Sequence, residues 1–146
     1  MSEQTAPRQL VVFTLGSEHY ALPIQQVHEI IRYSEPRSVA SREDWVRGVI
    51  SLRGRIVPVY DLAARLGVPS ELSEHTKIVI VEAGSETAGV IVDGVEEVLT
   101  VSPDQIEEVP TADTTLIDYI AKVGDRLIVL LKPSMIFAAA DYATAA

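Results

Sequence analysis

The sequence contains no cysteine, and this absence excludes several kinds of chemistry together. A chain without thiols has no disulfide framework, no thiolate nucleophile and none of the zinc sites that depend on cysteine ligands. The lack of cysteine also fits a reducing compartment, where disulfides are rare.

Long apolar runs and basic patches are missing as well. The longest apolar runs, such as residues 127–131, fall far short of the ~18 residues that cross a bilayer, and residues 1–8 are polar, unlike a signal peptide. We therefore expect a cytosolic protein that does not insert into the membrane. The formal net charge is −9, and the strongest basic feature is Arg53 with Arg55, so we expect no nucleic-acid partner.

What the chain does contain is a large share of hydrophobic residues, 47% of 146. That share suffices for one ordinary domain, or for two very small ones that share a core, without a disulfide or a structural metal. The apolar residues occur in short runs rich in Val and Ile between turn residues, which predicts a mainly β fold. The predicted strands span residues 10–15, 19–22, 27–33, 49–52, 56–60, 78–81, 88–92, 95–101, 116–123 and 126–132.

The stretch from residue 48 to residue 62 is the clearest local feature. Its two runs rich in Val and Ile predict a tight hairpin in which Gly54 supplies a positive φ. Asp61 follows the second run, and its carboxylate can accept from the free N–H groups of a short helix over 62–66. Gly67 stands where a left-handed residue would end that helix.

Two further signals lie in the second half of the chain. Asp93 and Gly94 stand between the strands 88–92 and 95–101, and Asp-Gly between apolar runs is the strongest short hairpin signal in the sequence. Pro133 is well placed as the first residue of a C-terminal helix, because its missing N–H has no partner there in any case.

The two halves of the chain resemble each other. Residues 27–30 recur as residues 95–98, at an offset of 68, and the hairpin glycine Gly54 recurs as Gly124, at an offset of 70. A short helix follows the hairpin in both halves. The agreement of offset and element order predicts two small β-barrels of about five short strands each, built on one plan.

The sequence offers no recognisable catalytic or metal site. The three histidines, His19, His28 and His75, are dispersed and lack a second ligand at metal spacing. The adjacent acidic pairs are Glu43 with Asp44, Glu96 with Glu97, and Glu107 with Glu108. Neighbours on a strand point to opposite faces, so these pairs do not form catalytic dyads. We therefore expect no enzyme activity and no cofactor, and instead a domain that offers surfaces to other proteins.

One feature of the central hairpin carries charge. Arg53 and Arg55 lie at the tip of an otherwise apolar hairpin, where a guanidinium can offer a rigid fork to a carboxylate. That carboxylate can belong to the same chain or to a partner. The alternative is a solvated turn with no specific role, because charged loop tips usually face water.

The order and spacing of several segments resemble the CheW family of chemotaxis coupling proteins. The likeness runs from about Leu10 to Phe137, and it is the whole set rather than one motif that is specific. The segments are Leu10-Val11-Val12-Phe13-Thr14-Leu15-Gly16 with Tyr20, Val27-His28-Glu29-Ile30-Ile31, Arg47-Gly48-Val49-Ile50-Ser51-Leu52-Arg53-Gly54, Ile56-Val57-Pro58-Val59-Tyr60-Asp61-Leu62, Val92-Asp93-Gly94-Val95 with Val98-Leu99, and Gly124-Asp125-Arg126.

This resemblance implies a mainly β fold of two intertwined, SH3-like, five-stranded β-barrels, with short helices and a C-terminal helix. We expect a single CheW-like domain over residues 8–138. Its two barrel subdomains are expected at roughly 16–68 and 76–132, with the N-terminal strand and the C-terminal helix crossing between them. Residues 1–7 and 139–146 are expected to be flexible tails.

The resemblance also implies a function. CheW proteins are adaptors without catalytic activity that join the cytoplasmic tips of chemoreceptors to the regulatory domain of the histidine kinase CheA. We therefore expect a cytoplasmic protein located at receptor arrays under the inner membrane. The regulatory domain of CheA is itself similar to the family, so like pairs with like, and other CheW-like domains are further expected partners.

The positions that match functional residues of the family are Val27, Glu29, Gly48, Arg53, Val95 and Val98. In the family such residues serve receptor binding, kinase binding or the transmission of control between the two. A receptor tip is a helical hairpin, so an apolar groove between the barrels, lined by Val27, Val95 and Val98, would suit it. Core packing is the alternative role for these valines.

The sequence leaves two other interpretations open. The same motifs fit a coupling protein of another chemosensory pathway, such as one that controls pilus motility. A small β-barrel enzyme or ligand-binding protein is the remaining possibility, and it would require a concave pocket with convergent polar groups.

Overall fold

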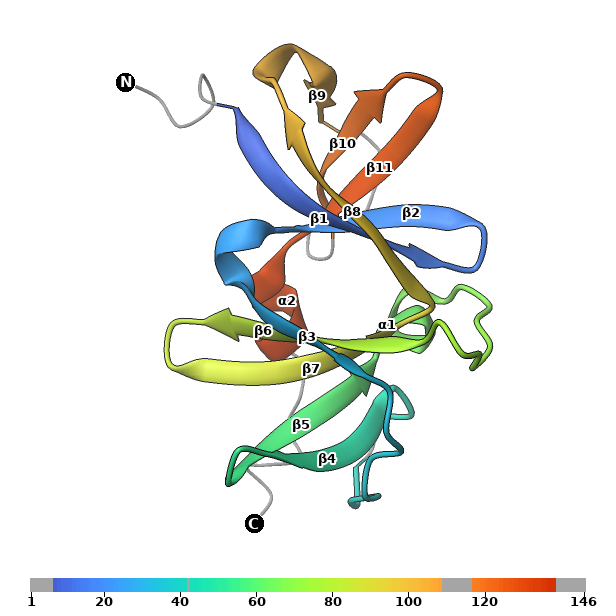
Figure 1. Cartoon of the computed structure of the whole chain (residues 1–146), viewed down its shortest axis with the longest axis vertical. Coiled ribbons are helices and arrows are strands. Elements are labelled where there is room, and N and C mark those ends of the chain that lie inside the picture. Colours follow the sequence, from blue (N-terminus) through green and yellow to red (C-terminus); the bar gives the residue numbers. More distant parts are fainter. Residues whose placement is uncertain (1–6, 42, 109–116, 139–146) are drawn as a thin grey trace.

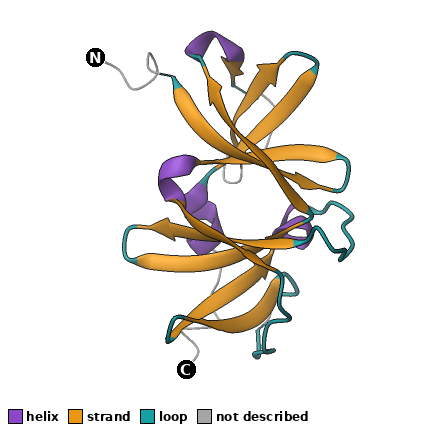
Figure 2. Ribbon diagram, in the orientation of Figure 1, coloured by secondary structure: helices purple, strands orange, loops and turns teal. Residues whose placement is uncertain are grey.

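The structure, a computed structural model, describes residues 7–41, 43–108 and 117–138 and consists mostly of β-strands in two sheets (Figure 1; Figure 2). The prediction of a mainly β fold is confirmed. Apart from Pro7, the predicted tails lie outside the described residues. The strands are β1 (Arg8–Leu15), β2 (Glu18–Pro23), β3 (Val27–Arg32), β4 (Val46–Leu52), β5 (Arg55–Asp61), β6 (Lys77–Ala83), β7 (Glu86–Val92), β8 (Gly94–Val101), β9 (Ile106–Glu107), β10 (Ile117–Val123) and β11 (Arg126–Leu131).

One sheet comes from the middle of the chain and the other from its two ends. The central sheet has the strand order β3-β6-β7-β5-β4, and the terminal sheet has the order β8-β1-β2-β11-β10-β9. Neighbouring strands are antiparallel except in one pair per sheet, β5 with β7 and β11 with β2. The two orders become identical when β1, β2, β8, β10 and β11 are matched with β6, β7, β3, β4 and β5. The predicted repeat is therefore present in the strand order.

Each sheet also closes on itself. In the central sheet Arg37, beyond the end of β3, forms a bridge with Val49 of β4 at the opposite edge. In the terminal sheet the chain leaves β8 through a 3₁₀ turn at Pro103–Gln105, and β9 then pairs with β10. Both sheets thus become small barrels, with one outer strand extended toward the other edge.

The sheets do not follow the predicted subdomain boundaries of 16–68 and 76–132. Residues 27–92 supply the central sheet, whereas residues 8–23 join residues 94–131 in the terminal sheet. The reason is an exchange of hairpins between the two repeats. Each sheet combines the first hairpin of one repeat with the last three strands of the other, which is what makes the barrels intertwined (Figure 1).

The same exchange overturns the hairpin predicted at Asp93 and Gly94. The strands before and after these residues, β7 and β8, belong to different sheets, so the chain crosses from one barrel to the other here. The Asp93 carboxylate accepts a hydrogen bond from the Gly16 N–H at 2.6 Å and another from the Ser70 hydroxyl. Asp93 therefore fastens the crossing rather than forming a turn.

Three hydrophobic cores hold the structure together. The interior of the terminal barrel contains Leu10, Val12, Ala21, Val101, Ala121, Ile128 and Leu130. The interior of the central barrel contains Ile50, Val57, Val59, Ile78, Ile80 and Ile91. The largest core lies between the sheets and contains Phe13, Leu15, Tyr20, Leu22, Trp45, Val46, Tyr60, Leu62, Ala63, Val79, Val81, Ala88, Val90, Val92, Leu131 and Ile136. Because the shared core is the largest, the two barrels are expected to be one folding unit.

The two helices contribute to this shared core through Leu62, Ala63 and Ile136, and Figure 1 shows both between the sheets. Helix α1 (Leu62–Leu66) begins at the predicted cap, where the Asp61 carboxylate accepts from the Ala64 N–H at 3.1 Å. It ends at Gly67, which has the predicted left-handed conformation with φ of 75°. Helix α2 (Pro133–Ala138) begins at the predicted proline.

Candidate partner-binding surface

Glu29 and Arg53, two of the predicted site residues, form an ion pair in the structure. Glu29 lies on β3, and the Arg53 guanidinium at the tip of the β4–β5 hairpin donates a hydrogen bond to its carboxylate. The Glu29 side chain keeps 21% of its exposure, whereas the Arg53 side chain keeps 69%. The pair thus places an accessible guanidinium at a defined position on the surface of the central barrel.

The backbone at Arg53 is unusual. Arg53 has a φ of 51° and is the one residue other than glycine with a positive φ in the described part of the chain. With Gly54, at φ of 79°, it forms the two-residue turn between Leu52 and Arg55, the pattern of a type I′ hairpin. A long side chain in this conformation is strained, and such strain concentrates at functional sites. The sequence predicted the positive φ for Gly54 but not for Arg53.

The ion pair changes the acidity of both members. The hydrogen bond from Arg53 holds the pKa of the Glu29 carboxyl below its ordinary value, and it outweighs the opposing effect of desolvation. The same hydrogen bond raises the pKa of Arg53. Both groups are therefore charged near neutral pH, and the pair can present its charges to a partner.

His28 and Glu82 extend this charged surface, and sequence reasoning did not identify them. His28 follows Val27 on β3, and its ring nitrogens lie 3.8 Å from the Glu29 carboxylate and 3.4 Å from that of Glu82. From the sequence, His28 was considered as a metal ligand and rejected, because no second ligand stands at metal spacing. Because Glu82 comes from β6, its proximity depends on the pairing of β3 with β6, which no local signal predicts.

Gly48 is buried rather than exposed. Its φ is 142°, and a Cβ added at this position would lie 1.9 Å from the carbonyl oxygen of Arg37. Arg37 and Val49 exchange two backbone hydrogen bonds, of 2.8 and 2.9 Å, beside it. Gly48 was predicted as a partner-binding residue, and in the structure the backbone of Arg37 packs directly against it.

The three predicted valines occupy two kinds of environment. Val27 on β3 and Val95 on β8 are partly buried and pack against the shared core, at equivalent positions of the two repeats. Val98 is 53% exposed, and a bulge on β8 separates it from Val95. Val27 and Val95 thus pack toward the core between the sheets, whereas Val98 is accessible; that the three valines line one groove stays a prediction.

A similar cluster of charges lies on the terminal barrel. The Arg126 guanidinium, next to the β10–β11 turn, donates to the Glu97 carboxylate at 2.8 Å, and Glu97 follows Glu29 by 68 residues. Arg126 also lies 3.5 Å from Glu96, which is 3.1 Å from His19. In both barrels a glutamate of the extended outer strand thus pairs with an arginine at or beside a hairpin turn, although Arg53 lies within its turn and Arg126 is the first residue of β11.

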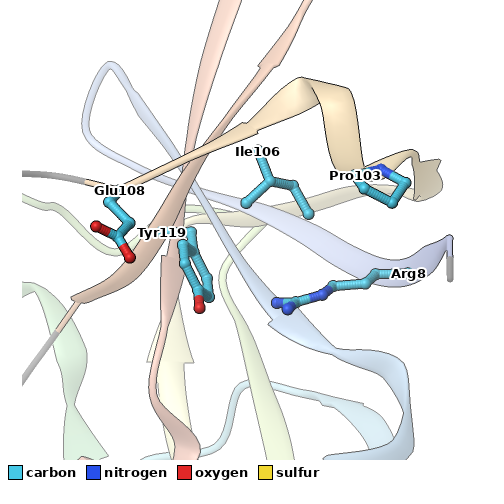
Figure 3. Close-up of a pocket in the computed structure, with 5 residues that line it drawn as sticks. All are labelled: Arg8, Pro103, Ile106, Glu108 and Tyr119. Carbon is cyan, nitrogen blue, oxygen red and sulfur yellow. The ribbon is translucent and has the colours of Figure 1, made fainter. Parts of the chain in front are cut away.

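The cavity shown in Figure 3 bears on the enzyme alternative. It has a volume of about 280 Å³ and is lined by Arg8, Pro103, Ile106, Glu108 and Tyr119. The Arg8 guanidinium stacks 5.0 Å from the centre of the Tyr119 ring. The lining residues do not include a nucleophile paired with a general base, so this cavity gives no support to a catalytic role.

The described part of the chain also lacks two other features. Across residues 7–41, 43–108 and 117–138, no three His, Cys, Asp or Glu side chains come together as metal ligands. Within the same residues, no helix has the length and apolar character that crossing a membrane requires.

Comparison with solved structures and known sequences gives consistent relatives. The chain is similar to the scaffolding protein TtCheW from Thermoanaerobacter tengcongensis, with a TM-score of 0.81 and 37% identity over 87% of this chain and 90% of that one. It is 31% identical over 90 residues to Chemotaxis protein CheW of Klebsiella aerogenes, covering 61% of this chain and 54% of that protein. Protein PilI of Pseudomonas aeruginosa is 30% identical over 71 residues, 48% of this chain and 40% of that protein.

These similarities differ in extent. The chain spans about half the length of the curated relatives it matches, or less, whereas the likeness to TtCheW covers most of both chains. The profile of the CheW-like domain family matches residues 9–141, which is nearly the whole sequence. The resemblance noted from the sequence is thereby confirmed, and the chain belongs to the family of CheW-like domains.

Proposed function

We propose that this protein is a non-catalytic adaptor that couples chemoreceptors to the histidine kinase CheA. The ion pair of Glu29 and Arg53 is the observation that carries the proposal, because a strained turn holds an exposed guanidinium beside a carboxylate of another strand. Membership of the CheW-like family and the likeness to a scaffolding protein support the same role.

The proposed partners are the regulatory domain of CheA, the cytoplasmic tips of chemoreceptors and other CheW-like domains within an array. The protein would act in the cytoplasm, at receptor arrays under the inner membrane. Glu29 and Arg53 form the proposed polar contact, and the exposed Val98 supplies apolar surface on the other barrel. Val27 and Val95 would act from below the surface, since both pack against the shared core.

Exposed apolar residues also occur on the central barrel. Ile30 on β3 is 40% exposed and Ile56 on β5 is 70% exposed, and both lie on the central barrel with the ion pair. Exposed apolar side chains on the same barrel as a charged pair fit a protein interface, whose buried centre is apolar and whose rim is polar. This arrangement suits a protein partner better than a small ligand.

Reconstitution of the protein with receptors and CheA tests the proposal. Arg53→Glu should leave the fold intact, because the side chain is mostly exposed, and should abolish activation of the kinase by receptors. The matched control is Arg126→Glu, beside the equivalent turn of the terminal barrel, which should keep the contact made by the central barrel. Normal activation with folded Arg53→Glu protein would reject Arg53 as a contact residue.

A charge swap separates contact from folding. In Glu29→Arg with Arg53→Glu, the two side chains can still pair with each other, but each presents the opposite charge to a partner. If coupling needs the guanidinium at the hairpin tip, the double variant should stay inactive although its stability recovers. Recovery of activation would mean that the pair only supports the fold.

The similarity to Protein PilI favours a second candidate, a coupling protein of a chemosensory pathway other than the flagellar one. Both candidates predict the same contacts, so binding assays with an isolated kinase domain do not separate them. Deletion of the gene, followed by separate measurements of swimming and of surface motility, distinguishes the two. Loss of surface motility alone would favour the second candidate.

A further inference from the structure

Gly48 and Arg37 lie at the closure of the central barrel, where the chain beyond β3 meets β4. The backbone N–H of Arg37 donates to the Val49 carbonyl at 2.8 Å, and the Arg37 carbonyl accepts from the Val49 N–H at 2.9 Å. This bridge is the contact that joins β3's continuation to the far edge of the central sheet. It therefore ties the chain that carries Glu29 to the strand that leads to Arg53.

The close approach depends on the absence of a side chain at Gly48. A Cβ there would lie 1.9 Å from the Arg37 carbonyl oxygen, 2.6 Å from its carbonyl carbon and 3.1 Å from the Cα of Ser38. All three atoms are backbone, so the clash cannot be relieved by rotating a side chain. A register shift on β4 between Val46 and Gly48 marks the same position as a bulge.

Gly48 differs in this respect from the other glycines of the central barrel, since a Cβ at Gly89 on β7 would meet only side-chain atoms, the nearest being Ile78 Cγ2 at 2.7 Å. Gly54 and Gly84 also have positive φ angles, of 79° and 62°, but a Cβ at either position would meet nothing within 4 Å. At these two positions glycine is needed only for the conformation of the turn. Gly48, in contrast, combines an unusual φ with contact between two segments that are distant in sequence.

We infer that Gly48 is a positioning residue, which admits the backbone of Arg37 against β4 and thereby sets Glu29 on β3 against Arg53 at the hairpin tip. It acts on the surface from below and does not touch a partner, since it is buried. The effect of Gly48 on partner binding rests on the proposed function, but its effect on the geometry of the ion pair does not.

The geometry can be tested in the isolated protein by nuclear magnetic resonance. In Gly48→Ala, the amide protons of Arg37 and Val49 should exchange with solvent at least about tenfold faster, because their mutual hydrogen bonds are lost. The titration of the Glu29 carboxyl should also move up toward its ordinary value as Arg53 withdraws. Gly84→Ala is the matched control, since it adds the same methyl at a positive φ without a close contact.

The inference fails if Gly48→Ala leaves both the exchange of these two amides and the Glu29 titration unchanged. It also fails if Gly84→Ala changes them equally, because strain in any turn of the barrel would then explain the effect. If Gly48→Ala does not fold, Arg37→Pro is the second variant. It removes the N–H that donates a hydrogen bond to the Val49 carbonyl and adds no side chain to β4. The same changes at Val49 and Glu29 are expected in that variant.

A double-mutant cycle then connects the geometry with binding. Titration of the protein with the CheA regulatory domain should show that Gly48→Ala weakens binding about tenfold in the native background and less than about twofold when Arg53 is already alanine. Equal losses in both backgrounds would show that Gly48 acts independently of Arg53 and would overturn the inference. If the native protein does not bind the domain, the proposed function fails while the exchange and titration results still decide the role of Gly48.

Discussion

The central and terminal barrels have the same strand order, yet their hairpin tips are built differently. At the β4–β5 tip of the central barrel both turn residues have positive φ, and the first of them is Arg53. At the β10–β11 tip of the terminal barrel the positive φ falls on Gly124, and Asp125 follows. Both barrels thus need a tight turn, but only the central barrel places strain on a charged residue.

The two barrels also close differently. The terminal barrel uses β9, a separate strand after a 3₁₀ turn whose capping box joins Ser102 and Gln105. The central barrel uses one bridge, and Gly48 must be free of a side chain for that bridge to form. The two repeats thus share their strand order, while the turn and the closure of the central barrel differ from the simplest solution. Such departures from local rules are expected at functional or strained sites.

The strongest test of the comparison is whether the barrels unfold together. Phe13→Ala should lower the free energy of unfolding by about 3–5 kcal/mol, because the ring is fully buried in the core that both sheets share. Urea unfolding should give a single transition when followed by circular dichroism and by the fluorescence of Trp45. Two separate transitions would mean that the barrels are independent units despite their exchanged hairpins.

A smaller effect is expected inside each barrel. Leu10 on β1 and Ile78 on β6 occupy equivalent strands, are 68 residues apart and are both fully buried, one in each barrel interior. Leu10→Ala and Ile78→Ala should each lower the free energy of unfolding by about 2–5 kcal/mol. Similar losses would support equal packing of the two repeats. A loss confined to one variant would show that one barrel core contributes little.

The sequence predicted the repeated elements because the signals for each turn and helix start are local. Each hairpin and helix start is determined by a few neighbouring residues, such as Gly54 at its turn and Asp61 at the cap of α1, and the structure confirms both. The pairing of Glu29 with Arg53 could not be predicted from local signals. A charge among apolar strand residues suggested two candidates, but only the fold reveals that they are partners.

The structural roles of Asp93 and Gly48 could not be predicted from the sequence. Asp-Gly is a hairpin signal only if the following strand returns to the preceding one, and here β8 pairs with β1 instead. That choice depends on which apolar faces pack together across the whole chain, and no short motif records it. Gly48 is similar, because its requirement for glycine comes from Arg37, eleven residues away, and from the closure of the barrel.

Asp93 provides a test of the crossing between the barrels. Asp93→Ala should lower the free energy of unfolding by about 1–2 kcal/mol, because the Gly16 N–H and the Ser70 hydroxyl lose an acceptor. Asp93→Asn keeps one carbonyl oxygen and should lose less. Thermal unfolding of both variants beside the native protein measures the difference. An unchanged Asp93→Ala protein would show that the crossing needs no fastening.

The smallest effect concerns pH and the ion pair of the central tip. The hydrogen bond from Arg53 lowers the pKa of Glu29, which means that the folded state stabilises the ionised carboxylate more than the unfolded chain does. The contribution of Glu29 to stability is therefore fully present above its ordinary pKa near 4.5 and decreases as the pH falls through the lower folded pKa. Over this range the native protein should lose stability.

Glu29→Gln isolates this contribution from that of the other carboxylates. The difference in unfolding free energy between native protein and Glu29→Gln should be constant above about pH 5.5 and should shrink as the pH falls below about 4. In an Arg53→Gln background the same substitution should have a much weaker pH dependence, because the bond that lowers the pKa is gone. Urea unfolding between pH 3 and 7 measures both differences. An equal pH dependence in both backgrounds would mean that Glu29 owes its low pKa to another group, and the likeness between the two barrel tips would then lose its electrostatic basis.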